Sequence, residues 1–274
     1  MATKASLRDK LFDVTMATVD AAMAIWPRPL PSREALERCR IIAHRGEHDN
    51  RNVFENTLHS FQLALDAGVW GIECDIRFTR DRVPVICHDP TANRVFGTPV
   101  EIAQTTFADL RAALPQIPSL EELVAQFGGR AHLMLELKNE EWPEPQRQCD
   151  SLREALAPLE PVRDFHLLSL HPPLYERVDF APASCFVPVA ETNVDTISRF
   201  ALERGCAGLG GHYLLSGKTV KRRHDGAGQQ LGTGFPTSGN CLRRELNRGV
   251  EWIFTNHAVK LETLRRHYLA SHTR

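Results

Sequence analysis

The sequence predicts an α/β fold of the closed (β/α)8 class, a TIM barrel, with a short β-hairpin at the catalytic face and an extra N-terminal helix. Eight short apolar runs alternate with helical patterns after residue 40, and polar clusters follow the ends of several runs. A chain of 274 residues can bury such a core in one piece, so we expect one barrel domain over 41–274. The predicted strands are 41–43, 71–76, 131–137, 165–169, 185–189, 207–211, 229–232 and 252–255.

Helical patterns fill most of the intervals between these strands. The first of them follows Asn56 and Thr57, which form a typical helix cap. Regular alternation of strand and helix favours a closed barrel over an open sheet. The predicted helices are 58–67, 120–127, 146–156, 194–204, 218–224, 241–248 and 259–269.

Residues 1–40 differ in character from the barrel. Apolar residues recur at helical spacing from Leu7 to Ile25, and three prolines in 26–31 then end the helix. Asp13 and Asp20 interrupt the apolar run, so neither a transmembrane segment nor a signal peptide is expected. We expect a helix packed on the barrel; the alternative is an interfacial helix that makes peripheral contact with a membrane.

Composition limits the classes of partner and compartment. The 33 basic and 34 acidic residues nearly balance, so no overall field attracts nucleic acid. The seven cysteines are odd in number and include no CxxC pair, which argues against a disulfide framework and a zinc site. A reducing compartment, the cytoplasm, is therefore expected.

Two apolar runs, GIECDI at 71–76 and PVICHD at 84–89, are too close in sequence for a crossover helix. We expect an antiparallel hairpin with its turn at Asp81 and Arg82, which places His88 opposite Asp75. Glu73 and Asp75 are two residues apart on a strand and therefore point to the same face.

Glu136 and Lys138 repeat this spacing at the end of the next predicted strand. Glu73, Asp75 and Glu136 together would repel one another without a cation. Carboxylate oxygens are the ligands that hard divalent cations prefer, so the three predict one site for Mg²⁺ or Ca²⁺. His212, at the end of the sixth predicted barrel strand, is a candidate substrate contact.

An ordered set of motifs resembles the glycerophosphodiester phosphodiesterase family. The motifs are HRG (44–46), ENT (55–57), GIECDI (71–76), T-x-D (79–81), PVICHD (84–89), PSLEEL (118–123) and LELK (135–138). The resemblance implies a barrel of the phosphatidylinositol phospholipase C-like kind. It also implies metal-dependent hydrolysis of glycerophosphodiesters, as small-molecule substrates, to glycerol 3-phosphate and an alcohol.

The resemblance also implies roles for individual residues. The implied roles are catalysis for His44 and His88, metal binding for Glu73, Asp75 and Glu136, and phosphate contact for Arg45 and Lys138. Cleavage of a phosphodiester needs a deprotonated nucleophile and a protonated leaving group, which two imidazoles can supply. We favour His44 as the base and His88 as the acid.

Some positions depart from the family pattern. About thirty residues separate Asp89 from Ser119, which predicts a small cap and an open mouth, and the last strand ends in Thr255 and Asn256 instead of T-D. An open mouth suits a second reading, a lysophospholipase D-like enzyme acting on lysophospholipids through a cyclic phosphate. A third reading is a barrel that binds a phosphoester without turnover. The sequence sets no oligomeric state.

Overall fold

The computed structural model describes residue 18 and residues 21–272. The helix expected between Leu7 and Ile25 lies largely outside the described residues; those of it that are described, 18 and 21–25, are helical. Among the described residues, every helix is too short or too polar to cross a lipid bilayer.

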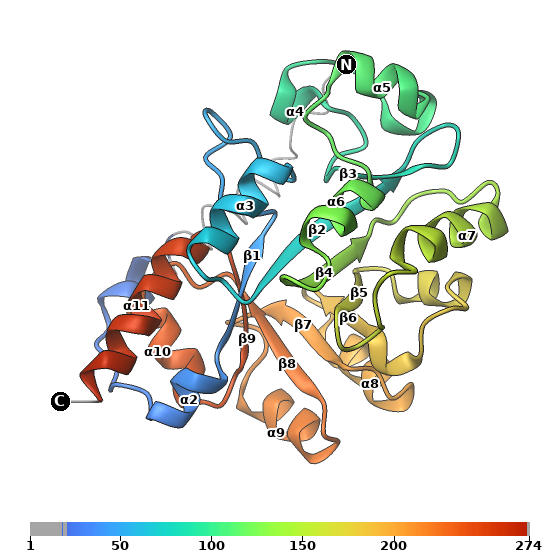
Figure 1. Cartoon of the computed structure of the whole chain (residues 1–274). Coiled ribbons are helices and arrows are strands. Elements are labelled where there is room, and N and C mark those ends of the chain that lie inside the picture. The colour runs from blue at the N-terminus through green and yellow to red at the C-terminus, as the bar shows by residue number, and fades with distance from the viewer. Residues whose placement is uncertain (1–17, 19–20, 273–274) are drawn as a thin grey trace.

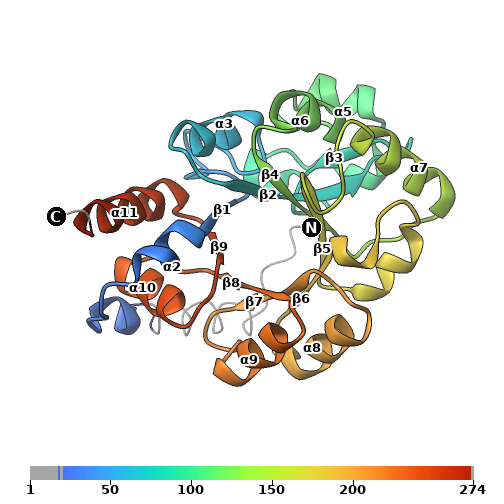
Figure 2. The same ribbon diagram turned by 60° about the horizontal axis from the view of Figure 1, so that its bottom comes forward.

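The described part of the chain folds into a closed barrel of eight parallel strands, with helices outside the ring of strands (Figures 1 and 2). Closure comes from β1, which pairs with both β2 and β9. The predicted TIM barrel and its eight strands are confirmed. The barrel strands are β1 (Arg40–His44), β2 (Gly71–Phe78), β4 (His132–Leu137), β5 (Phe165–Ser169), β6 (Phe186–Ala190), β7 (Gly208–His212), β8 (Gln230–Gly234) and β9 (Trp252–Thr255).

All seven predicted helices are present, with ends shifted by at most two residues. Thr57 caps α3, and Ser119 with Glu122 forms a capping box at α6, so both helices begin where side chains satisfy free backbone N–H groups. These helices are α3 (Leu58–Asp66), α6 (Leu120–Phe127), α7 (Pro145–Leu156), α8 (Val194–Glu203), α9 (Lys218–Gly226), α10 (Gly239–Asn247) and α11 (Ala258–Ser271).

Several short elements were not predicted. Most of them lie in the interval between the hairpin and α6, or between β5 and β6. They are α2 (Arg33–Arg38), α4 (Asn93–Phe96), α5 (Phe107–Ala113) and the 3₁₀ turns η1 (Ile102–Gln104), η2 (Pro172–Arg177) and η3 (Ala183–Cys185).

The predicted hairpin forms between β2 and β3 (Pro84–Ile86), but its expected register is wrong by one residue. Ile76 pairs with Ile86 and Phe78 with Pro84, so five residues, 79–83, connect the two strands in place of the expected two-residue turn. The backbone N–H of Cys87, and not that of His88, donates to the carbonyl of Asp75 at 2.9 Å. His88 therefore follows the last paired residues, and its carbonyl accepts a hydrogen bond from Arg77 Nε at 2.8 Å.

The amino end of the barrel interior is closed by two buried histidines. His132 Nε2 lies 2.7 Å from His166 Nδ1, and the ring of Trp70 stacks on His132 with centroids 4.4 Å apart. Burial lowers the pKa of His132 to about 4 and that of His166 to about 3. Both imidazoles are therefore neutral parts of the core at pH 7.

We expect acid to destabilise the fold through this pair. Both pKa values are depressed on folding, so the unfolded state binds more protons between about pH 6.5 and pH 4, and stability falls as pH falls through that window. The free energy of unfolding of the wild type should therefore fall between pH 7 and pH 5. In His166→Phe this fall should be smaller by about 2 kcal/mol. Urea titrations at the two pH values measure this loss, with exposed His267→Gln as the control. An unchanged loss in His166→Phe would contradict the assignment.

Candidate functional site

A pocket of about 310 Å³ opens at the carboxyl ends of the barrel strands. It brings together most of the residues singled out in the sequence: His44, Arg45, Glu73, His88, Glu136, Lys138 and His212 line it. Asp75 is fully buried behind this lining and contacts Arg45 and Lys138. The eight positions thus form one constellation.

Strand register explains why these residues meet. In the parallel pairing of β1 with β2, His44 lies beside Glu73. In the pairing of β2 with β4, Asp75 lies beside Glu136. Neighbouring residues in a parallel sheet point to the same face, so the two pairings place one imidazole and three carboxylates at one end of the barrel.

Glu73, Asp75 and Glu136 present carboxylate oxygens that all lie within 4.8 Å of one another. Burial and the charges of Asp75 and Glu136 raise the pKa of Glu73 well above its ordinary value. Burial and Asp75 raise the pKa of Glu136 as well. Three oxygen donors held against their mutual repulsion fit the needs of one hard divalent cation.

Two basic side chains offset part of this negative charge. Arg45 Nε lies 3.2 Å from Asp75 Oδ2, and Lys138 Nζ lies 2.7 Å from Glu136 Oε1 and 3.3 Å from Asp75 Oδ1. Although burial opposes the shift, these two cations lower the pKa of Asp75 below its ordinary value. Asp75 is therefore ionised, whereas the negative charge of Glu73 is disfavoured in the absence of a cation.

His44 is oriented by a residue that the sequence analysis noted only as a departure from a motif. Its Nδ1 lies 2.6 Å from the side-chain oxygen of Asn256, which follows β9. An amide oxygen only accepts, so Nδ1 carries the proton and the unprotonated Nε2 faces Glu73 at 3.7 Å. Burial and the charge of Arg45 lower the pKa of His44 to about 3. His44 is thus a neutral imidazole with a free Nε2.

His88 is held differently. Its Nδ1 donates to Asp89 Oδ1 at 2.8 Å, and Asp89 Oδ2 accepts from Arg94 Nε at 2.5 Å. Although burial opposes the shift, the hydrogen bonds from His88 and Arg94 lower the pKa of Asp89 to about 2. Asp89 thus holds the Nδ1 edge of the His88 ring, which leaves Nε2 as the ring nitrogen that can exchange a proton with a bound substrate.

A second row of polar residues fixes the carboxylates. Asn56 has a left-handed backbone (φ 56°) and donates from Nδ2 to Asp75 Oδ2 at 2.8 Å. Glu55, which precedes it, accepts from Arg45, Asn50 and Arg94. The ENT motif therefore braces the acidic cluster from the β1–α3 loop.

The opposite wall of the pocket is apolar. Leu170 and Leu215, at the mouth, are 38% and 40% exposed, and the ring of Phe235 lies 4.6 Å from that of His44. The sequence analysis did not predict this wall, because its members come from several strand ends and loops that are far apart in the chain. They are Leu168, Leu170, Val189, Leu215, Phe235 and Phe254.

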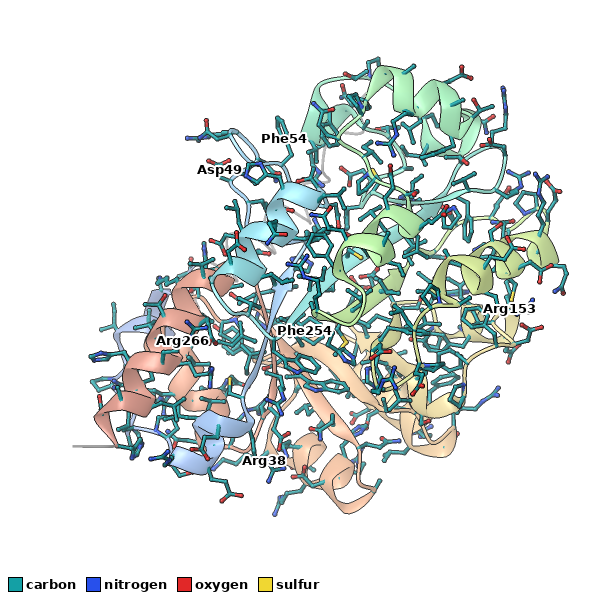
Figure 3. All side chains as sticks on the ribbon, in the orientation of Figure 1. Arg38, Asp49, Phe54, Arg153, Phe254 and Arg266 are labelled. Atoms are coloured by element: carbon teal, nitrogen blue, oxygen red, sulfur yellow. The ribbon has the colours of Figure 1, made fainter. Side chains whose placement is uncertain are left out.

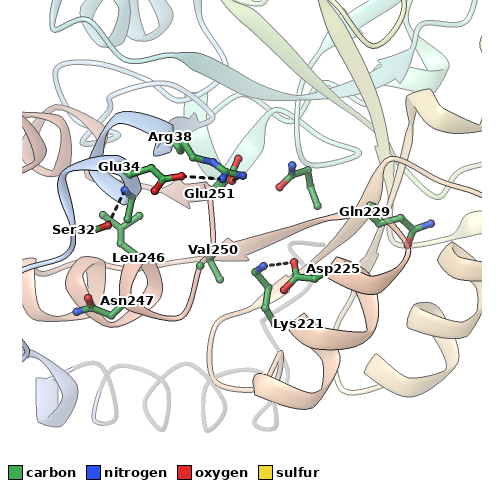
Figure 4. A pocket seen from close by; sticks show the side chains of 14 residues that line it. Ser32, Glu34, Arg38, Lys221, Asp225, Gln229, Leu246, Asn247, Val250 and Glu251 are labelled. Carbon is green, nitrogen blue, oxygen red and sulfur yellow. Dashed lines mark hydrogen bonds and ion pairs between the residues drawn. The ribbon is translucent and has the colours of Figure 1, made fainter.

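A second hollow, of about 520 Å³, lies at the opposite end of the barrel between α2, α9 and the start of β9 (Figure 4). Its charged side chains pair with one another: Arg38 with Glu34 and Glu251, and Lys221 with Asp225. These charges compensate within the hollow, so the carboxylates and histidines at the carboxyl end define the candidate site.

Comparison with known proteins relates this arrangement to one family. Residues 44–163 match the model of the glycerophosphoryl diester phosphodiesterase family. Over 118 residues, 36% of this chain and 35% of the relative, the chain is 36% identical to glycerophosphodiester phosphodiesterase 1 of Mus musculus. A glycerophosphodiester phosphodiesterase of Caldanaerobacter subterraneus is 32% identical over 111 residues, 36% of this chain and 45% of the relative. The matches thus span less than half the length of these curated relatives.

Solved structures share the fold. A glycerophosphodiester phosphodiesterase from Thermotoga maritima superposes with a TM-score of 0.70 at 18% identity, covering 82% of this chain and 98% of the other. An Oleispira antarctica phosphodiesterase in complex with the product sn-glycerol-3-phosphate superposes with a TM-score of 0.65 at 23% identity, covering 84% and 98%. The similarity therefore extends over the whole barrel.

Proposed function

We propose that this chain is a member of the glycerophosphoryl diester phosphodiesterase family, and that it hydrolyses glycerophosphodiesters to glycerol 3-phosphate and an alcohol. One observation carries the proposal: two histidines with opposite environments face three clustered carboxylates in one pocket. The reaction needs a base, an acid and neutralisation of phosphoryl charge, and this pocket offers all three.

In this proposal, Glu73, Asp75 and Glu136 hold one Mg²⁺ or Ca²⁺ ion. The bound cation would neutralise charge on a phosphoryl oxygen of the substrate. It would also remove the repulsion among the three carboxylates. Arg45 and Lys138, which pair with these acids in the structure, would then be free to donate hydrogen bonds to the phosphate.

His44 is the base and His88 the acid. The unprotonated Nε2 of His44 takes the proton of the attacking hydroxyl, and the proton that Asn256 holds on Nδ1 stays in place. His88, whose Nδ1 is held by Asp89, gives a proton to the departing alkoxide. His212, at the end of β7, lines the pocket beside the apolar wall and contacts the substrate there.

A second candidate reaction is the cleavage of lysophospholipids at the same phosphodiester. The apolar wall that contains Leu215 and Phe235 favours it, because an acyl chain gains free energy by leaving water for such a surface. Internal attack by the substrate's own hydroxyl would give a cyclic phosphate in this case. The catalytic residues would be the same.

Phosphorus NMR of the products tests both candidates. Glycerophosphocholine and lysophosphatidylcholine are each incubated with the protein and Mg²⁺ or Ca²⁺. We expect glycerol 3-phosphate from the first substrate, and lysophosphatidic acid or its cyclic form from the second if the acyl chain is accepted. Release of phosphocholine, or no turnover of either substrate, would contradict the proposal.

Leu215→Asp should separate the two substrates. Loss of an apolar contact at the mouth is expected to lower kcat/KM for lysophosphatidylcholine about tenfold, and that for glycerophosphocholine less than about twofold. Val162→Asp is the control, because Val162 is equally exposed (40%) but precedes β5 at the other end of the barrel. Equal effects on the two substrates would mean that the wall does not contact an acyl chain.

A further inference from the structure

His88 stands where the chain leaves the barrel. It follows β3 and precedes an insertion, residues 89–118, that contains α4, η1 and α5 and lies above β3 in Figure 1. The insertion packs around an apolar cluster separate from the barrel core: Val85, Cys87, Ala92, Ile102, Leu110, Leu114 and Ile117. The placement of the His88 ring therefore depends on how the insertion is held against the rest of the site.

Arg94, on α4, connects the insertion with the loop that follows His44. Its Nη1 and Nη2 donate to the two carboxylate oxygens of Glu55 at 3.1 and 2.6 Å, and its Nε donates to Asp89 at 2.5 Å. We name Glu55, Arg94 and Asp89 the Arg94 bridge. Each nitrogen of the guanidinium faces a carboxylate, an arrangement that lysine cannot reproduce.

Each end of the Arg94 bridge contacts a catalytic histidine or the residue next to one. Asp89 holds Nδ1 of His88, and Glu55 also accepts from Arg45, the neighbour of His44, at 3.2 Å. The rings of Phe54 and Phe96 meet alongside the bridge with centroids 5.2 Å apart; Phe54 is labelled in Figure 3. Arg94 itself is not part of the pocket lining, so it does not reach the substrate.

We propose that Arg94 is a positioning residue, which fixes the His88 ring relative to His44 by holding Asp89 and Glu55 in one fork. This inference rests on the proposed phosphodiesterase reaction, in which His88 must reach the leaving group. Loss of Arg94 frees the Asp89 carboxylate, so the His88 ring loses its fixed orientation. Neither Arg94 nor Asp89 belongs to the pocket lining or to the carboxylate cluster.

Kinetics of Arg94→Ala and Arg94→Lys with glycerophosphocholine test the proposal. We expect kcat to fall about 10- to 100-fold in Arg94→Ala with KM changed less than about threefold, and Arg94→Lys to fall between this variant and the wild type. Arg153→Ala is the matched control, because Arg153 also pairs with two carboxylates at similar exposure but lies on α7, away from the site (Figure 3). Wild-type kcat in Arg94→Ala, or a change in KM alone, would overturn the proposal.

A double variant separates positioning from a general loss of structure. Since Arg94 acts largely through Asp89, replacing Arg94 in an Asp89→Asn background should cost much less than it does in the wild type. Fully additive losses would contradict the inference.

A third readout needs no turnover. Nitrogen NMR of the His88 ring should show the proton fixed on Nδ1 in the wild type and in Arg153→Ala, and a mixture of ring forms in Arg94→Ala. An unchanged His88 signal in Arg94→Ala would overturn the proposal even if the protein hydrolysed no phosphodiester. An inactive wild type with the expected NMR change would instead count against the proposed function.

Discussion

Replacing His44 by alanine is expected to lower kcat for glycerophosphocholine about 10³-fold or more, with little change in KM. His44 presents an unprotonated Nε2 to the acidic cluster, because the side-chain oxygen of Asn256 accepts the proton of its Nδ1 in a hydrogen bond. Without it, the attacking hydroxyl must lose its proton to water. Steady-state kinetics measure the loss, and His59→Ala, an exposed histidine on α3, is the control.

The leaving group distinguishes the roles of the two histidines. The p-nitrophenolate anion is a good leaving group that departs without being protonated. His88→Ala should therefore lose much less activity on glycerophospho-p-nitrophenol than on glycerophosphocholine. His44→Ala should be equally impaired on both substrates, because the base is needed for each. The reverse pattern would exchange the two roles. If His88→Ala lost as much activity on the p-nitrophenol ester as on glycerophosphocholine, a general-acid role for His88 would be contradicted.

Removal of the divalent cation is expected to have an effect of similar size. EDTA should reduce turnover to background, and Glu136→Gln should weaken cation binding at least about 100-fold, because one of three charged ligands is lost. Titration calorimetry with Mg²⁺ and Ca²⁺ measures the affinity. Glu160→Gln, which changes an exposed carboxylate paired with Arg163, should bind the cation as the wild type does.

Stability gives a second readout of the same cluster. In EDTA, Glu73→Gln should be more stable than the wild type, because one of three mutually repelling buried charges is removed. With saturating Mg²⁺ the order should reverse, since a ligand that binds only the folded state stabilises it. Melting temperatures of both proteins with and without cation check this. If neither Mg²⁺ nor Ca²⁺ changed the melting temperature of the wild type, a metal site at these residues would be contradicted.

The strands and most helices could be predicted because each leaves a local signal. Apolar runs such as Phe165 to Ser169 read directly as buried strands, and the caps at Thr57 and Ser119 mark helix starts. α5 was missed because seven residues in a short insertion show too little periodicity. The hairpin register was wrong because a two-residue turn was assumed, whereas the loop from Thr79 to Val83 has five residues.

The candidate site was only partly predictable, for a different reason. Motif residues such as Glu73 and Glu136 lie on the neighbouring strands β2 and β4, so the barrel fold alone brings them near one another. Asn256 and Arg94 act through contacts between segments distant in sequence, 212 residues in the case of Asn256 and His44. No local pattern encodes such contacts. The apolar wall around Leu215 was missed for the same reason, because its members come from segments distant in sequence.

The central claim is that a cation held by three carboxylates and a neutral His44 together cleave a glycerophosphodiester. The most direct test measures release of glycerol 3-phosphate from glycerophosphocholine by the wild type and by His44→Ala, each with Mg²⁺, with Ca²⁺ and with EDTA. We predict release by the wild type with at least one cation, none with EDTA, and almost none by the variant under any condition. Release that persists in EDTA, or in His44→Ala, would contradict the account.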